Sequence, residues 1–144
     1  MHSALLRGAL CLALTAFASA ACDKTVTTIP DSGPTSPEVT EPPFTGTLTI
    51  NGGVTQAFSA TAVGNVTAVI ANIDPNTSDF SLSVGLALGT WNGTSCQIVL
   101  VNDNAGVGAG VAGFANAAGE LCARVYDVGK LTQPVTFDVT IKHY

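Results

Sequence analysis

Cysteines are the residues of this chain best suited to covalent chemistry, and there are four of them. Cys96 and Cys122 form an even pair in the part of the chain expected to fold, and in an oxidising compartment such pairs become disulfides. Closing the loop between them would stabilise the fold by roughly 3 kcal/mol. The alternatives are a metal pair or a reactive thiol, but no nearby Cys or His completes such a site. We therefore expect a Cys96–Cys122 disulfide.

Cys22 lies where the chain changes from an apolar segment to a polar one. The preceding residues run from a positively charged start (1–7) through an apolar stretch (8–17) to small residues, which is typical of an export signal. The apolar stretch is too short for an uncleaved anchor, because a helix needs about 20 apolar residues to span a bilayer. Residues 19–22, Ser-Ala-Ala-Cys, resemble a bacterial lipobox, except that Ser19 occupies the usual place of Leu.

Two cleavage positions predict two different exported proteins. A cut after Ala21 would make Cys22 the first residue, where its thiol can carry a lipid that anchors the chain at the bacterial envelope. A cut after Ala20 would release a soluble protein into the periplasm or the medium. We favour lipidation of Cys22 and keep free secretion as the alternative.

Two polar segments supply candidate ligand contacts. Trp91, the single tryptophan, and Asn92 fall in a predicted turn, where an exposed ring can stack on a sugar or anchor a protein. The alternative is a ring folded back over the end of the domain. Asn102, Asp103 and Asn104 open a predicted loop at 102–110 and carry oxygens that suit calcium. One Asp supplies little charge for a divalent ion, so we expect no cofactor and keep calcium as the alternative.

Signals for catalysis are weak. His143 lies near the end of the last predicted strand, where we expect a frayed position rather than a base held by a carboxylate. Residues 108–113 match the dinucleotide pattern GxGxxG, but no helix follows to receive a phosphate. Four carboxylates lie at predicted turns and strand ends, where Asp usually caps the backbone: Asp74, Asp79, Asp103 and Asp127. We predict no enzymatic activity and no catalytic residues, with a carboxylate-dependent hydrolase as the alternative.

Strands are the elements that must position these residues. Apolar and polar residues alternate with a period of two from residue 44 onward. The predicted strands are 44–50, 54–58, 65–73, 80–88, 95–101, 111–115, 120–127 and 135–142. Asn51-Gly52-Gly53 predicts a hairpin between the first two. Seven or eight such strands without a helical period predict an all-β fold, an antiparallel β-sandwich.

The chain divides into three predicted regions: a signal peptide (1–21), a linker (22–43) and the sandwich domain (44–144). The linker is rich in Thr, Pro and Ser and has too little apolar surface to fold alone. The net charge of −5 argues against nucleic acid as a partner. We expect membrane contact only through the N-terminal lipid, because no second apolar segment is long enough to span a bilayer.

Short β patterns also carry a family resemblance. They occupy residues 46–48 with 56–58, 79–84, 119–126 and 137–141, and Leu121 stands where a Tyr is usual. Together they resemble the bacterial pre-peptidase C-terminal domain across residues 44–144. The resemblance implies a jelly-roll-like sandwich without catalytic residues. Members of this family are usually appended to peptidases or other secreted proteins, but no such partner domain is attached to the sandwich domain here.

These observations lead to one expected function. We expect a non-catalytic, exported binding or accessory module of the cell envelope, anchored by lipid. Its loops would contact an envelope protein or a polysaccharide, and the sequence does not identify which. A soluble secreted structural protein without a specific ligand is the alternative.

Overall fold

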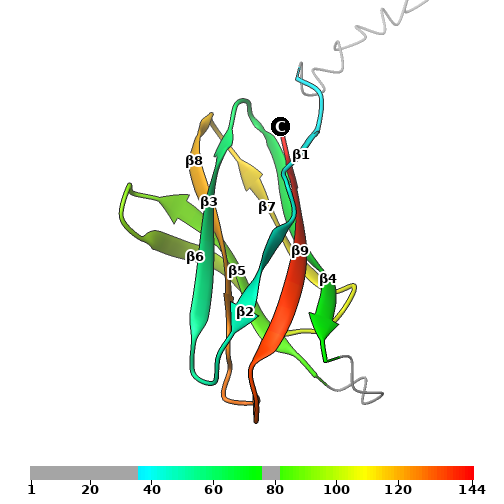
Figure 1. Ribbon diagram of the computed structural model, residues 1–144. Coiled ribbons are helices and arrows are strands. Elements are labelled where there is room, and N and C mark those ends of the chain that lie inside the picture. Colours follow the sequence, from blue (N-terminus) through cyan, green and yellow to red (C-terminus); the bar gives the residue numbers. More distant parts are fainter. Residues whose placement is uncertain (1–35, 76–81) are drawn as a thin grey trace, which may run out of the picture. The chain divides into compact units, whose positions relative to one another are not determined.

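A computed structural model describes residues 36–75 and 82–144, and these residues form strands and connections without any helix (Figure 1). The predicted signal peptide, Cys22 and the linker up to residue 35 lie outside the described residues, as do Asp79 and the turn after Pro75. The strands of the described part are β1 (Val39–Thr40), β2 (Phe44–Leu48), β3 (Gly53–Ala60), β4 (Gly64–Asp74), β5 (Val84–Trp91), β6 (Cys96–Ala105), β7 (Gly110–Ala115), β8 (Gly119–Tyr126) and β9 (Val135–His143).

The strands form two antiparallel sheets that pack face to face. One sheet has the order β1-β9-β4-β7, with β2 also paired to β9, and the other has the order β3-β8-β5-β6. The all-β antiparallel sandwich predicted from the sequence is confirmed. Apart from β5 and β6, consecutive strands from β2 to β9 lie in opposite sheets, which is the connectivity of a jelly roll.

The first predicted turn is present, but it joins two sheets rather than two paired strands. Asn51 has a φ of 55°, and the N–H of Gly52 donates to the Thr49 carbonyl oxygen at 2.9 Å. The strands on either side diverge, since β2 pairs with β9 whereas β3 pairs with β8. The hairpin prediction is therefore wrong. Leu48 and Phe58 reach the same core from opposite sheets, so both strands bury their apolar faces without pairing.

The core lies between the sheets and follows the predicted alternation most closely in β9. Val135, Phe137, Val139 and Ile141 are all buried, as the sequence predicts. Phe137 packs against Phe44 of β2 with the ring centroids 5.1 Å apart and the rings nearly perpendicular. This edge-to-face contact adds to the free energy gained from burying both rings.

His143 continues the buried face of β9 and is only 1% exposed. Its Nε2 lies 2.8 Å from Oε1 of Glu41, and its ring stacks on Phe58 at 5.4 Å. The expected frayed position is therefore wrong. The inward alternation of β9 extends from Ile141 to His143, whose ring stacks on Phe58 of the opposite sheet while β1 pairs with this end of the strand.

Strand β1 lies inside the range predicted as linker. Val39 is in register with His143 on β9, and the N–H of Glu41 donates to the Ile141 carbonyl oxygen at 3.0 Å. An ion pair of 3.2 Å between Glu38 and Lys142 adds to this contact at the surface. The residues that pair with the domain thus begin before Phe44.

Candidate functional site

Trp91 and Asn92, two of the predicted ligand contacts, lie at the end of β5 and in the turn that follows. Strand β5 continues through Trp91, which is half-buried and in register with Cys96 of β6. The side-chain oxygen of Asn92 accepts hydrogen bonds from the N–H groups of Thr94 and Ser95 at 2.9 and 2.8 Å. Asn92 therefore shapes the turn between β5 and β6, and its oxygen is already engaged.

Asn102, Asp103 and Asn104 lie in β6 and not in the loop that the sequence predicts. Asn and Asp are disfavoured in strands, but pairing with β5 continues through Ala105 with a register shift in this stretch. The Asn102 amide donates to the Gly110 carbonyl oxygen at 3.2 Å, and Asp103 accepts the hydroxyl of Tyr126. In the described part of the chain, no cluster of His, Cys, Asp and Glu could hold a metal ion.

Asn104 belongs to a polar network that the sequence did not reveal. Ser83 is buried, and its hydroxyl donates to Oδ1 of Asn104 at 2.8 Å. The Lys130 ammonium donates both to the Ser83 oxygen and to Asn104, each at 2.9 Å. A Ser–Lys pair can supply a nucleophile and its base, but here the lysine donates to the hydroxyl and the serine proton points to an amide. The network is a satisfied structural one.

Asp127 and Asp103, two of the hydrolase candidates, are each engaged with a different partner. Asp127 accepts backbone hydrogen bonds from Asn51 at 2.8 Å, from Gly129 and Lys130, and from Leu131. These bonds, the one from Asn51 above all, lower the pKa of Asp127. The carboxylate thus caps a turn, which is the role that its position in the sequence suggests.

Tyr126 lies against Asp103 on the outer face of the second sheet. Burial above all, together with the hydrogen bond to Asp103 and the charge of that carboxylate, raises the pKa of Tyr126 from 10.0 to about 12. The neutral phenol is therefore the form that this contact stabilises.

Two cross-strand links join β8 to β6 across β5. One is the disulfide between Cys96 and Cys122, whose Cα atoms are 5.7 Å apart, which confirms the predicted bridge. The other is the Tyr126–Asp103 hydrogen bond. Glycines of β5 allow these close approaches: the Tyr126 ring lies over Gly85, and the backbone of β6 lies close to Gly89. A Cβ on Gly89 would lie 2.1 Å from the Gln97 carbonyl oxygen, and a Cβ on Gly85 would lie 2.3 Å from the Tyr126 ring.

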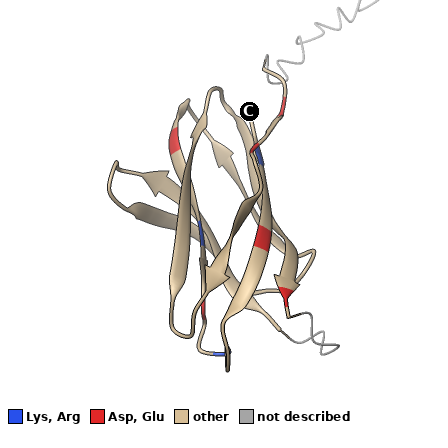
Figure 2. Cartoon of the chain, viewed as in Figure 1, with Lys and Arg blue, Asp and Glu red and all other residues tan. Residues whose placement is uncertain are grey.

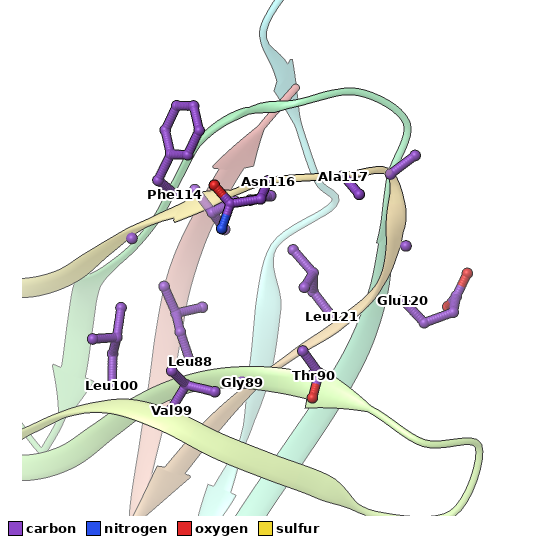
Figure 3. A pocket seen from close by; sticks show the side chains of 15 residues that line it. Leu88, Gly89, Thr90, Val99, Leu100, Phe114, Asn116, Ala117, Glu120 and Leu121 are labelled. Carbon is purple, nitrogen blue, oxygen red and sulfur yellow. The ribbon is translucent and has the colours of Figure 1, made fainter.

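An apolar groove of about 370 Å³ opens between the sheets near the β7–β8 connection (Figure 3). Leu88 of β5, Leu100 of β6 and Leu121 of β8 point into it. The side chains of Phe114 and Glu120 point away from it. The β7–β8 connection, 116–118, and Gly119 at the start of β8 line one side of the groove. A pocket of this size and lining suits an apolar group of a ligand. The sequence did not reveal this groove, because its lining comes from five strands of both sheets.

Strand β6 forms an exposed apolar border beside the groove. Ile98, Val99, Leu100 and Val101 are between 38% and 69% exposed. No residue from Cys96 to Asn102 is charged, and the projecting end of the β5–β6 hairpin is tan in Figure 2. The sequence predicts a strand here but does not reveal that the strand lies at the edge of its sheet.

No model of a known protein family matches this chain, and no curated protein matches its sequence. No helix in the described residues is long and apolar enough to cross a membrane. The function is therefore argued from the groove and its surroundings.

Proposed function

We propose that the folded domain is a non-catalytic binding module whose groove receives an apolar group of a partner. The proposal rests on the groove itself, an apolar opening lined by Leu88, Leu100 and Leu121. Apolar surface left in water costs roughly 25 cal/mol per Å². A ligand that covers these side chains recovers that free energy.

A protein suits this groove better than a polysaccharide does. The polar side chains in the lining are few, namely Thr90, Asn116 and Glu120, whereas a sugar needs several donors and acceptors. Trp91, the candidate stacking platform, is half-buried at the end of β5. We therefore propose an envelope protein as the partner, bound through an apolar side chain and not through the predicted polar loops.

The exported, lipid-anchored location belongs to the same proposal. The Cys96–Cys122 disulfide supports an oxidising compartment outside the cytoplasm. Anchoring at Cys22 rests on the lipobox resemblance alone. The relation to the pre-peptidase C-terminal domain is also a proposal, which rests on the short β patterns of the sequence alone.

Site-specific photo-crosslinking in the native cells tests the groove directly. A photoreactive residue in place of Leu121 should capture one defined protein, whereas the same residue in place of Thr45, exposed on β2, should not. Ala117→Trp should fill the groove and abolish that capture. Ala57→Trp is the matched control, because Ala57 is exposed on β3 outside the groove lining. Capture that is equal at both positions, or absent at Leu121, would favour a structural protein without a specific ligand.

A further inference from the structure

Strand β6 is the last strand of its sheet; its Asn102 side chain reaches β7 of the other sheet, and its pairing with β5 shifts register at Val99. In the order β3-β8-β5-β6, β5 is the only described strand that pairs with it. Natural edge strands are usually blunted by lysine, proline or inward-pointing charge, because an open edge pairs readily with another strand. None of these residues occurs from Cys96 to Asn102.

Strand β3, at the opposite edge of the same sheet, also has no lysine, proline or charge, but its exposed side chains are small or polar. Strand β3 turns its large ring, Phe58, into the core and exposes Ala57 and Ser59 at that end. Thr55 and Gln56 occupy its middle. On β6 the four consecutive apolar residues 98–101 are exposed instead. The apolar surface is therefore a property of the β6 edge and not of edges in this fold generally.

We propose that β6 is the interface through which a second copy of this chain binds, edge to edge and antiparallel about a two-fold axis. The occupant of this edge must offer free backbone N–H and C=O groups along an extended strand, together with uncharged apolar side chains. Strand β6 of a second copy offers both. A two-fold arrangement satisfies both edges at once and joins the two β3-β8-β5-β6 sheets into one.

Charge permits this pairing although the chain has a net charge of −5. Asp103 is the one charged residue of β6. The two-fold axis is expected to pass beside a residue between Ile98 and Val101. Asp103 of one copy then lies opposite a residue between 93 and 99 of the other copy, and none of those residues is charged. No like charges therefore face each other along the paired edge.

The two cross-strand links prepare β6 for pairing. The disulfide at Cys96 fixes the start of β6 to the sheet, and the contact between Asp103 and Tyr126 fixes its end. The strand is therefore ordered in the unbound protein. A strand that is already ordered loses less conformational freedom on binding.

The size of the patch makes the interaction weak. Stable complexes bury about 800 Å² per partner, whereas the β6 patch consists of four partly exposed side chains. The dimer should therefore form only at high concentration. Anchoring at a membrane, which is part of the proposed function, would raise the local concentration.

Sedimentation equilibrium of the exported chain, purified with its disulfide intact, tests the proposal. The average mass of wild type should rise from one copy towards two with increasing concentration. Val99→Lys and Val101→Lys should weaken association at least tenfold, because each places a like-charged pair near the two-fold axis. Val63→Lys is the matched control, since Val63 is also exposed but lies in the β3–β4 connection. Thermal unfolding of each variant verifies that it is folded.

Amide hydrogen exchange provides a second readout. Exchange of the β6 amides should slow at concentrations where the mass rises, and exchange in β3 should not change. A single-copy mass at every concentration, or an equal loss of association in Val63→Lys, would overturn the proposal. Exchange in β6 that is independent of concentration while the mass doubles would also overturn it. Capture at Leu121 by the photo-crosslinking experiment does not depend on any of these results.

Discussion

Strands β9 and β6 each carry four large apolar residues, alternating with polar ones in β9 and consecutive in β6, and the two sets have opposite surroundings. The apolar residues of β9 at 135, 137, 139 and 141 are at most 3% exposed, whereas those of β6 at 98–101 are at least 38% exposed. Strand β9 lies between β4 on one side and β1 with β2 on the other, but β6 pairs only with β5 among the described strands. Apolar residues therefore predict a strand in both cases. The strands and loops that pack against it determine whether their side chains are buried or exposed.

Matched isoleucine substitutions should show the largest difference between the two strands. Ile141 of β9 is fully buried and Ile98 of β6 is 45% exposed. Ile141→Ala should lower the free energy of unfolding by about 4 kcal/mol, since it leaves a cavity. Ile98→Ala should lower it by about 1 kcal/mol or less. Urea unfolding measures both, and equal losses would mean that β6 is buried in solution.

Removal of the disulfide should loosen β6 more than β9. Replacing Cys96 and Cys122 together by Ser should lower the free energy of unfolding by about 3 kcal/mol, because the closed loop no longer restricts the unfolded chain. Hydrogen exchange should quicken most in β6, whose start is held by this bridge. If β9 lost protection first, the bridge would not be the contact that holds β6 in place.

Alanine substitutions at Gly89 of β5 and Gly119 of β8 should show whether a glycine is required by close packing. Gly89→Ala should lower the free energy of unfolding by about 2 kcal/mol, since the added Cβ meets the backbone of Gln97. Gly119→Ala is the control, because a Cβ there meets no atom within 4 Å, and it should change stability by less than about 0.5 kcal/mol. Thermal unfolding of the two variants measures the difference. Similar stabilities would show that β6 does not cross Gly89 closely.

Alkaline titration should reveal the smallest of these effects, the contact between Tyr126 and Asp103. The pKa of Tyr126 is raised from 10.0 to about 12, so the folded state holds the phenol proton more tightly than the unfolded state does. The resulting stability is complete below pH 10 and is lost as the pH rises towards 12. Asp103→Asn should move the absorbance transition of Tyr126 towards 10.0. Tyr126→Phe identifies that transition by removing it, and an unchanged transition in Asp103→Asn would contradict the contact.

Local pattern predicted most of the strands and the contacts that depend on them. The alternation in β9 depends only on residues two apart, and so does the placement of Val139 and Ile141 in the core. The Cys96–Cys122 bridge followed from there being no other cysteine in the folded part. The sheet change at Asn51 was not predicted, because it depends on the pairing of β2 with β9 and of β3 with β8 across most of the chain.

The candidate site was harder to predict than the fold. Asn102 and Asp103 have the composition of a loop, yet backbone pairing with β5 holds them in a strand. The groove needs Leu88, Leu100 and Leu121 from three strands, and no local pattern links them. His143 could have been placed correctly, since it has the same parity as Ile141, but its partner Glu41 lies far away in the sequence.

The pairing of β1 and β2 with β9 also has a mechanical consequence. When the domain is held where β9 begins at Val135, a force that pulls on the chain before Val39 acts along β1 and β2, since both run antiparallel to β9. Hydrogen bonds in such a ladder lie perpendicular to the strands, so this force loads many of them together in shear and does not unzip them one at a time. The domain should therefore resist a pull from its N-terminal side better than a pull that peels β6 away from β5.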